Sequence, residues 1–278
     1  MKYNNDVLFL SVAGFCIKIE FNKTPRLFEK KIIKNQIKKT FKFFIKQQKN
    51  TTRSFFTLNF VDRMAPRIIT KVKKKENFIE FYRLKGRHII TFYDISIIQF
   101  QYIMQYVIQL ILINNQGLFI HSSAINYCGK AYLFLGQSGT GKSTIIKMLK
   151  NKFEILSDDS SIIKKSGNKF FYYQTPFIEK ESWVPKKNIK YPIGKIFLLR
   201  KSKKIKLKKV NNKNYVIEQF SKHIFFDWTP IDWVKGKQNK ANFKHLLHFL
   251  LNFDQVYQLS FPKNKTDVVN LFNSLEIS

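Results

Sequence analysis

Cysteine is scarce in this sequence, and the shortage excludes two kinds of site. Cys16 and Cys128 are the only two cysteines among 278 residues. Two cysteines supply neither a disulfide framework nor a four-cysteine zinc site. Because a chain without a disulfide framework suits a reducing compartment, we expect a cytoplasmic protein.

Long uninterrupted apolar runs are also missing. The most apolar stretch, residues 95–113, is interrupted by four glutamines. Its unbroken part is well below the roughly 20 residues that a membrane-spanning helix needs. The start of the chain contains an apolar run but lacks the charged segment and the cleavage-site pattern of a secretory signal. We therefore expect no membrane span and interpret residues 95–113 as a buried helix.

Acidic residues are few, since 18 Asp and Glu stand against 50 Lys and Arg, a formal net charge of +32. Such a charge attracts polyanions, so a nucleic acid or an anionic lipid is one partner that it predicts. The alternative is compositional drift, because Lys, Asn, Ile and Phe are abundant together and the basic residues are spread along the whole chain. We favour drift, and a polyanion partner stays open.

Hydrophobic residues make up 44% of the chain and aromatic residues 16%, so the chain can bury a sizeable core. A helix-stop signal at residues 114–117 divides it into two parts. Residues 1–114 are expected to form an α+β accessory region. Its expected elements are strand 7–20, helix 26–48, strands within 51–64 and 77–94, and helix 95–113.

Glycine becomes denser after that boundary, because five of the ten glycines lie between Gly117 and Gly141. Apolar strands and helices then alternate, which predicts an α/β domain over residues 115–278. Its expected strands are 117–127, 131–136, 153–158, 161–165, 170–175, 191–200, 203–210 and 255–261, and its expected helices are 143–151, 242–253 and 266–275.

A phosphate-loop motif opens the first of these helices. Residues 136–143 read GQSGTGKS, the G-x-x-x-x-G-K-[ST] pattern, between an apolar strand and a helix as the motif requires. The glycines allow a tight turn that points backbone N–H groups at phosphate, and the helix N-terminus adds its dipole. Lys142 would reach the β- and γ-phosphates, and the Ser143 hydroxyl would ligate Mg²⁺. The residues expected to bind ATP are Gly136, Gln137, Ser138, Gly139, Thr140, Gly141, Lys142, Ser143 and Thr144.

An acidic pair follows one helix later. Asp158 and Asp159 end an apolar strand 16 residues after Lys142. In a parallel sheet that position places two carboxylates beside the phosphate loop, where one can hold Mg²⁺ and the other can accept a proton. The LSGGQ-type signature of transporter ATPases is missing from the sequence. Residues 264–267, NKTD, match a guanine-reading motif, but their place before a helix predicts a helix cap.

This arrangement resembles the catalytic domain of HPr kinase/phosphorylase and its looser relatives. His121 stands 15 residues before Gly136, LFLGQSGTGKST corresponds to the loop and ILSDDSSII to the acidic strand end. The resemblance implies a P-loop nucleotide-binding mixed sheet related to phosphoenolpyruvate carboxykinase, and a serine-kinase activity that uses ATP and Mg²⁺. It also implies that Asp158 is the catalytic base, Asp159 a metal ligand together with Ser143, and His121 a polar neighbour that tunes the base. The two aspartate roles remain interchangeable.

The sequence departs from HPr kinase after the acidic pair. The glycine-rich segment of that family has no counterpart in residues 170–185, where Glu179 or Glu181 would be a substitute metal ligand. We therefore predict a kinase for a hydroxyl of an unidentified protein, peptide or small metabolite. A regulatory nucleotide-binding module without transfer and a basic nucleic-acid-associated ATPase remain alternatives, and the last requires lysines clustered beside the nucleotide site. Oligomeric state stays open.

Overall fold

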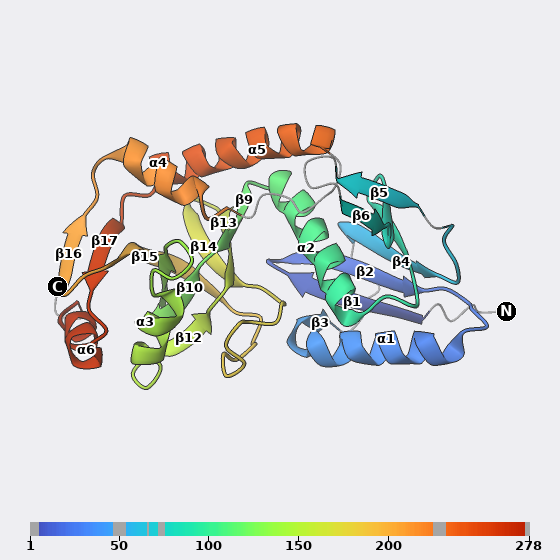
Figure 1. Cartoon of the computed structure of the whole chain (residues 1–278), viewed down its shortest axis with the longest axis horizontal. Helices are drawn as coiled ribbons and strands as arrows, with labels where there is room; N and C mark the ends of the chain where they lie inside the picture. The colour runs from blue at the N-terminus through green and yellow to red at the C-terminus, as the bar shows by residue number, and fades with distance from the viewer. Residues whose placement is uncertain (1–5, 47–53, 66, 72–75, 225–231, 276–278) are drawn as a thin grey trace. The chain divides into compact units, whose positions relative to one another are not determined.

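The computed structural model describes residues 6–46, 54–65, 67–71, 76–224 and 232–275 (Figure 1). The chain divides into two compact units, Met1–Ile111 with Asp227–Gly236, and Leu112–Phe226 with Lys237–Ser278. Each unit is built on its own large sheet, six-stranded in the first and nine-stranded in the second. The molecule is thus a mixed α/β protein. That the units serve as accessory and nucleotide-binding domains stays a prediction.

The first unit is a mixed sheet with two helices. Its strand order is β3-β1-β2-β4-β8-β7, and β5 pairs with β6 in a separate two-stranded sheet. The helices bury aliphatic and aromatic side chains such as Ile33, Ile37 and Phe100. The elements are β1 (Asp6–Val12), β2 (Phe15–Phe21), α1 (Leu27–Thr40), a 3-10 turn η1 (Lys42–Phe44), β3 (Ile45–Lys46), β4 (Phe56–Val61), β5 (Ile68–Lys71), β6 (Glu76–Ile79), β7 (Tyr82–Lys85), β8 (His88–Phe92) and α2 (Ile97–Ile113).

Helix α1 is shorter than the predicted helix 26–48. It ends at Thr40 and is followed by the 3-10 turn, which turns the chain so that Leu10 and Ile45 pair across β1 and β3. Phe41 and Phe44 are both buried at this bend. Burial of these rings and the new strand pairing therefore override a helical spacing that continues in the sequence.

The second unit has a larger mixed sheet in which β12-β10-β11-β15-β14-β13-β9 follow one another, while β17 pairs with β15 and with β16. Strands β11, β15 and β17 are parallel. The elements are β9 (Gly117–His121), β10 (Ser123–Tyr127), β11 (Lys130–Leu135), α3 (Lys142–Leu149), β12 (Glu154–Ser157), β13 (Ser160–Ser166), β14 (Lys169–Gln174), β15 (Lys190–Lys201), β16 (Lys206–Lys209), α4 (Lys213–Ser221), α5 (Asp232–Leu251), β17 (Val256–Phe261) and α6 (Lys265–Ser274).

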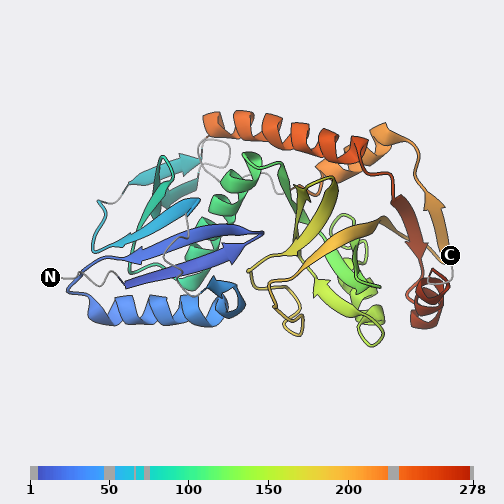
Figure 2. The same cartoon turned by 180° about the vertical axis from the view of Figure 1, so that it is seen from behind.

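Helices cover both faces of this second sheet. Figures 1 and 2 both show α4 and α5 on the opposite side of the sheet from α3 and α6. One core cluster contains Phe220 and Phe249 from the first pair, and the other contains Ile145 and Phe272 from the second. The sheet is therefore a middle layer whose strands are apolar on both faces, as the continuous apolar runs of β11 and β15 indicate.

The elements of this unit correct some of the predictions and confirm another. The predicted strand 117–127 is divided at Ser122, because β9 pairs with β13 whereas β10 pairs with β11 and β12. Helix α4 was not predicted, and α5 begins ten residues before the predicted position 242, at Asp232. The cap at Asn264 is confirmed, since its side chain accepts a hydrogen bond from the Thr266 N–H. Within the described part of the chain, no helix has the length and apolar character to cross a bilayer.

Candidate nucleotide site

The motif residues 136–141 form the loop between β11 and α3, and Lys142 begins the helix. The Lys142 ammonium donates hydrogen bonds to the carbonyl oxygens of Gly136 at 2.5 Å and Gln137 at 3.4 Å. Burial lowers the pKa of Lys142, and the nearby Asp159 and Asp158 carboxylates oppose that shift. The lysine head is thus held by the loop backbone and faces both aspartates.

The tip of the loop is open to solvent. Gln137, Ser138 and Gly139 are exposed, whereas Lys142 is buried. The loop closes on itself because the Thr140 hydroxyl and N–H both donate to the Gln137 carbonyl, at 2.8 and 3.1 Å. An exposed turn of this kind, followed by a helix N-terminus, suits an anionic ligand.

Two glycines of the loop allow a matched stability test. Gly139 and Gly141 both have a positive φ, but a Cβ added at Gly139 meets nothing within 4 Å, whereas one at Gly141 lies 2.8 Å from Cζ of Phe261. We expect Gly139→Ala to cost about 1 kcal/mol from backbone strain alone. Gly141→Ala should cost about 1–3 kcal/mol more, from overpacking against the ring. Urea unfolding of both variants measures the difference, and equal midpoints would contradict the close contact.

The acidic pair reaches the same sheet edge as the loop. Strand β10 runs antiparallel to β11 and to β12, so β11 and β12 are parallel to each other although β10 lies between them. Asp158 and Asp159 follow the carboxyl end of β12 just as the loop follows the carboxyl end of β11. The side chains that the sequence predicted for one site are therefore brought together, although through a mixed rather than an all-parallel sheet.

Asp158 is a buried carboxylate with one oxygen that has no partner among the described residues. Asp158 is 1% exposed, and its Oδ2 has no hydrogen-bond partner among the described residues. The Ser123 hydroxyl donates to the Asp158 carbonyl at 2.8 Å and lies 3.4 Å from Oδ1. Burial is the largest cause that raises the pKa of Asp158, and the Ser143 hydroxyl acts against it. Such an oxygen is costly unless a proton or a ligand occupies it.

Asp159 lies in a different environment from its neighbour. Its side chain is 42% exposed and lies 3.2 Å from Nδ1 of His121, which also lies 2.6 Å from the Asp159 carbonyl oxygen. The hydrogen bond with His121 is the largest cause that lowers the pKa of Asp159, and Lys142 adds to it. His121 therefore contacts Asp159, whereas the sequence interpretation made it a neighbour of the base at Asp158.

A buried ion pair fixes the backbone of both aspartates. Oε2 of Glu179 accepts hydrogen bonds from the N–H groups of Asp158 at 3.0 Å and Asp159 at 2.8 Å. Oε1 of Glu179 accepts from the Lys186 ammonium at 2.5 Å, and Lys186 also donates to the Thr175 carbonyl. Because both oxygens of Glu179 accept hydrogen bonds, it holds the acidic pair in place, and a role as the substitute metal ligand stays a prediction.

Glu181 is bound as well, to the outer surface of α3. Its carboxylate accepts from Lys147 at 2.8 Å and from the Trp183 indole N–H at 2.9 Å. The Lys150 ammonium lies 5.1 Å from the centre of the Trp183 ring. The segment after β14 is therefore attached both to the acidic pair and to the helix that follows the loop. No sequence motif marked Lys186, and the sequence did not predict these contacts of Trp183.

His223 is a buried residue of this site that sequence reasoning missed. Its carbonyl oxygen accepts a hydrogen bond from the His121 N–H at 2.7 Å. Burial, followed by the charge of Lys142, lowers the pKa of His223 to about 4, so the ring is neutral at pH 7. A single histidine just after a helix carries no recognisable pattern, and only the fold brings it near Lys142.

Basic residues gather at the same edge of the sheet. Leu199 of β15 lies against the loop, 3.3 Å from a Cβ built on Gly136, and Arg200 and Lys201 follow it. Lys206 of β16 pairs with Ser260 of β17, next to Phe261, the ring that contacts Gly141. We call Arg200, Lys201, Lys203, Lys204 and Lys206 the basic strand ends; all five are exposed. No acidic residue interrupts this part of the sequence.

The oxygen atoms of the site fit a magnesium ion. Ser143, Asp158 and Asp159 offer hydroxyl and carboxylate oxygens, and the unpartnered Oδ2 of Asp158 leaves an acceptor unused. Among the described residues, no group of three or more His, Cys, Asp or Glu side chains could hold a metal by itself. Mg²⁺ is usually held by one or two carboxylates together with substrate phosphates, so the two observations agree.

The fold and the site define a mixed α/β protein with a glycine loop and an acidic pair at one sheet edge. A family model described as "SynChlorMet cassette protein ScmC" matches residues 90–242, which is more than half of the chain. The matched region contains the loop, the acidic pair and the basic strand ends. The chain belongs to the ScmC family.

Comparison with other proteins adds little about activity. No curated protein matches the sequence. Among solved structures, the chain is similar to the Hpr(Ser) kinase/phosphatase from Coxiella burnetii, with 14% identity, a TM-score of 0.29, and coverage of 57% of this chain and 98% of that one. These values are too low to transfer an activity.

Proposed function

We propose that this protein is an ATP- and Mg²⁺-dependent phosphotransferase with a P-loop nucleotide-binding sheet of the HPr kinase type, acting on a hydroxyl group of a protein, peptide or small metabolite. The observation that supports this best is the buried Asp158 carboxylate, with one oxygen unpartnered among the described residues, at the sheet edge that carries the loop. A purely structural strand end would expose that carboxylate or give both of its oxygens a partner. A transferase needs a proton acceptor there.

The loop would bind the triphosphate. The N–H groups of its exposed residues and the N-terminus of α3 would attract phosphate oxygens, and Lys142 is held within the loop by the Gly136 carbonyl. Bound phosphate would replace the Gly136 and Gln137 carbonyls as hydrogen-bond partners of Lys142. Ser143 and Asp159 would hold Mg²⁺, which when bound neutralises charge on the transferred phosphoryl group.

The two aspartates differ in a way that favours separate roles. Burial raises the pKa of Asp158, which makes it the better proton acceptor for an attacking hydroxyl. His121 and Lys142 lower the pKa of Asp159, which keeps it ionised as a metal ligand. The assignment of Asp158 as base and Asp159 as ligand, which the sequence left interchangeable, is therefore the one we propose.

Binding and transfer with γ-labelled ATP test this proposal. We expect ATP to bind the full chain in the presence of Mg²⁺, and Lys142→Ala to weaken binding about 10- to 100-fold, because a charge-assisted contact to phosphate is lost. Exposed Lys169→Ala is the matched control and should bind normally. Calorimetry measures the affinity, and label incorporation from a lysate detects the acceptor.

Each outcome selects one function. Incorporation of label that Lys142→Ala removes supports the transferase. Binding without transfer under any condition would replace it by the regulatory module. ATP hydrolysis that needs no acceptor and is stimulated by single-stranded RNA would favour the nucleic-acid-associated ATPase. The specific observation that supports this alternative is the exposed basic strand ends beside the loop.

A further inference from the structure

One face of α1 exposes large apolar side chains to solvent. Leu27 is 70% exposed, Phe28 73% and Ile32 41%. At 100° per residue these three lie within one half of the helix, and the buried Ile33 and Ile37 lie on the other half. The helix therefore packs on the first unit through one face and leaves a second apolar strip uncovered.

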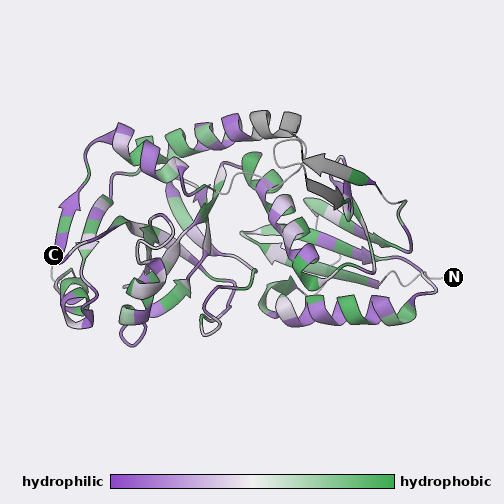
Figure 3. Cartoon of the chain, viewed as in Figure 1, coloured by the Kyte–Doolittle hydropathy of each residue, from purple (hydrophilic) through white to green (hydrophobic). Residues whose placement is uncertain are grey.

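Lysines lie on the same exposed half. Lys31, Lys38 and Lys39 are exposed among the apolar side chains, and Figure 3 shows hydrophobic and hydrophilic residues alternating along α1. Just beyond the helix, in the 3-10 turn, Phe43 is also exposed, at 55%. The only acidic residue of α1 is the partly buried Glu29. The exposed half of α1 thus combines apolar and positively charged groups.

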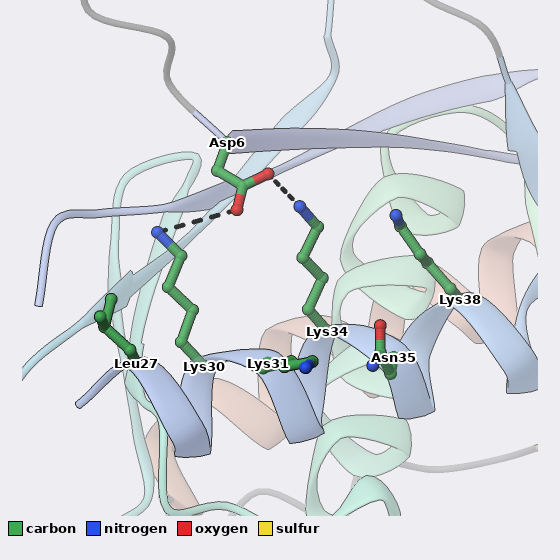
Figure 4. Close-up of a pocket in the computed structure, with 7 residues that line it drawn as sticks. All are labelled: Asp6, Leu27, Lys30, Lys31, Lys34, Asn35 and Lys38. Atoms are coloured by element: carbon green, nitrogen blue, oxygen red, sulfur yellow. Dashed lines mark hydrogen bonds and ion pairs between the residues drawn. The ribbon is translucent and has the colours of Figure 1, made fainter.

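A basic hollow borders this face. It has a volume of about 370 Å³ and is lined by Asp6, Leu27, Lys30, Lys31, Lys34, Asn35 and Lys38 (Figure 4). Asp6 forms ion pairs with Lys30 and Lys34, whereas Figure 4 draws no such contact for Lys31 or Lys38. One carboxylate against four ammonium groups leaves the hollow positively charged, which suits a phosphate group.

We propose that the exposed face of α1, with its basic hollow, docks on the surface of an anionic membrane. A helix that lies in the headgroup region inserts apolar side chains such as Phe28 and Ile32 to the acyl boundary. Its lysines extend to the anionic headgroups while their methylene stems remain against apolar surface. Phospholipid phosphate would occupy the hollow. Such a surface uses both the apolar and the positively charged groups of the face.

Charge and polarity argue against two other occupants. A second copy of this face would bring lysines against lysines, since the exposed half of α1 has no acidic residue to pair with them. A nucleic acid backbone would use the lysines but leave the exposed aliphatic groups of Leu27 and Ile32 without a partner. An acidic, apolar protein segment is the remaining competitor, and the experiment separates it.

Vesicle co-sedimentation of the full chain tests the proposal without depending on the nucleotide site. We expect binding to phosphatidylcholine vesicles that contain about one-third phosphatidylserine and much weaker binding to phosphatidylcholine alone, with affinity falling as salt rises. Lys31→Gln with Lys38→Gln and Lys39→Gln should weaken binding roughly fivefold per lysine. Phe28→Ser with Ile32→Ser should weaken it about tenfold or more. The control triple variant, Lys130→Gln with Lys152→Gln and Lys169→Gln, removes the same amount of charge away from α1 and should bind nearly as wild type does.

Four results would overturn the proposal. Absence of binding to both vesicle types, or equal binding to both, removes the anionic surface. An equal loss in the control triple variant means that only net charge acts. Loss through the lysines with none through Phe28→Ser and Ile32→Ser means a polyanion site that does not insert. Capture of a fluorescent polyglutamate peptide by this face, together with no vesicle binding, assigns it to an acidic protein segment instead. The substituted side chains are exposed, so unchanged unfolding midpoints should accompany every variant.

Discussion

Asp158→Asn is expected to remove phosphoryl transfer while it makes the nucleotide-free protein more stable. An asparagine cannot accept the proton of an attacking hydroxyl, and loss of a general base lowers the rate about 10²- to 10⁴-fold. The same substitution removes a buried carboxylate whose Oδ2 has no partner in the described part of the chain. That change should stabilise the folded state by about 1–3 kcal/mol. Opposite effects on rate and stability are characteristic of a functional carboxylate.

The pH dependence of this stabilisation follows from the pKa of Asp158. Burial raises that pKa above its ordinary value of 3.8 in the folded state, so folding favours the protonated acid. The contribution of Asp158 to stability is complete below its unfolded pKa and is lost as the pH rises through its folded pKa. The asparagine side chain of the variant does not titrate. The stability gain of Asp158→Asn should therefore be absent at low pH and grow as the pH rises from the ordinary range of aspartate.

Urea unfolding of wild type and Asp158→Asn over a pH series measures the difference in their unfolding free energies. The contributions of the other titrating groups largely cancel in this difference, because both proteins share those groups. Asp159→Asn is the matched control. His121 and Lys142 lower the pKa of Asp159, so its contribution is present above its unfolded pKa and is lost as the pH falls through the folded value. Its replacement should destabilise the protein at neutral pH. A destabilised Asp158→Asn would show that the carboxylate is a structural anchor and not a base.

Glu179→Ala should have the largest effect on stability. The substitution leaves the Lys186 ammonium without its buried partner and removes the acceptor of the Asp158 and Asp159 N–H groups. Breaking a buried ion pair from one side costs about 3–5 kcal/mol, and the partial exposure of the Lys186 side chain, at 16%, places this pair at the lower end. Transfer should fall together with stability, because the two carboxylates lose their fixed position.

Second substitutions separate the two roles of Glu179. Glu179→Gln keeps an oxygen that can accept both N–H groups but leaves Lys186 charged and unpaired. Combining Glu179→Gln with Lys186→Met removes that charge, so this double variant should regain most of the stability and most of the transfer. Glu179→Ala with Lys186→Met should regain only part of the stability, because the two N–H groups still lack their acceptor, and it should not regain transfer. Equal transfer by the two double variants would mean that Glu179 does not position the acidic pair.

The sequence was most informative where chemistry depends on neighbours in the chain. The residues from Gly136 to Gly141 form the loop between a buried strand and the helix that begins at Lys142, as the motif predicts, because the requirement for glycine and for a helix start is local. The acidic pair lies at the carboxyl end of β12, where alternating strands and helices place such residues. The roles assigned to these residues remain predictions that the substitutions above test.

Long-range pairing was beyond reach of the sequence. The stretch 117–127 has polar residues at 121–123, but no glycine or proline marks a break at Ser122, and no local signal shows that its two halves pair with different partners. Glu179 and Lys186 look like surface residues in a segment rich in charge, yet the fold buries their pair under the acidic strand end. The bend after Thr40 likewise depends on the pairing of Ile45 with Leu10. Each of these features is decided by contacts between distant parts of the chain.

The bond from Glu179 to two successive amides has a mechanical consequence. A carboxylate that accepts from both N–H groups transmits any shift of its own segment to the two aspartates together. The same segment is tied to α3 through Glu181 and Lys147. Movement of this single segment would therefore change the spacing between the acidic pair and the loop. The geometry of the site is therefore set both by the sheet and by the segment after β14, which contains Glu179 and Glu181.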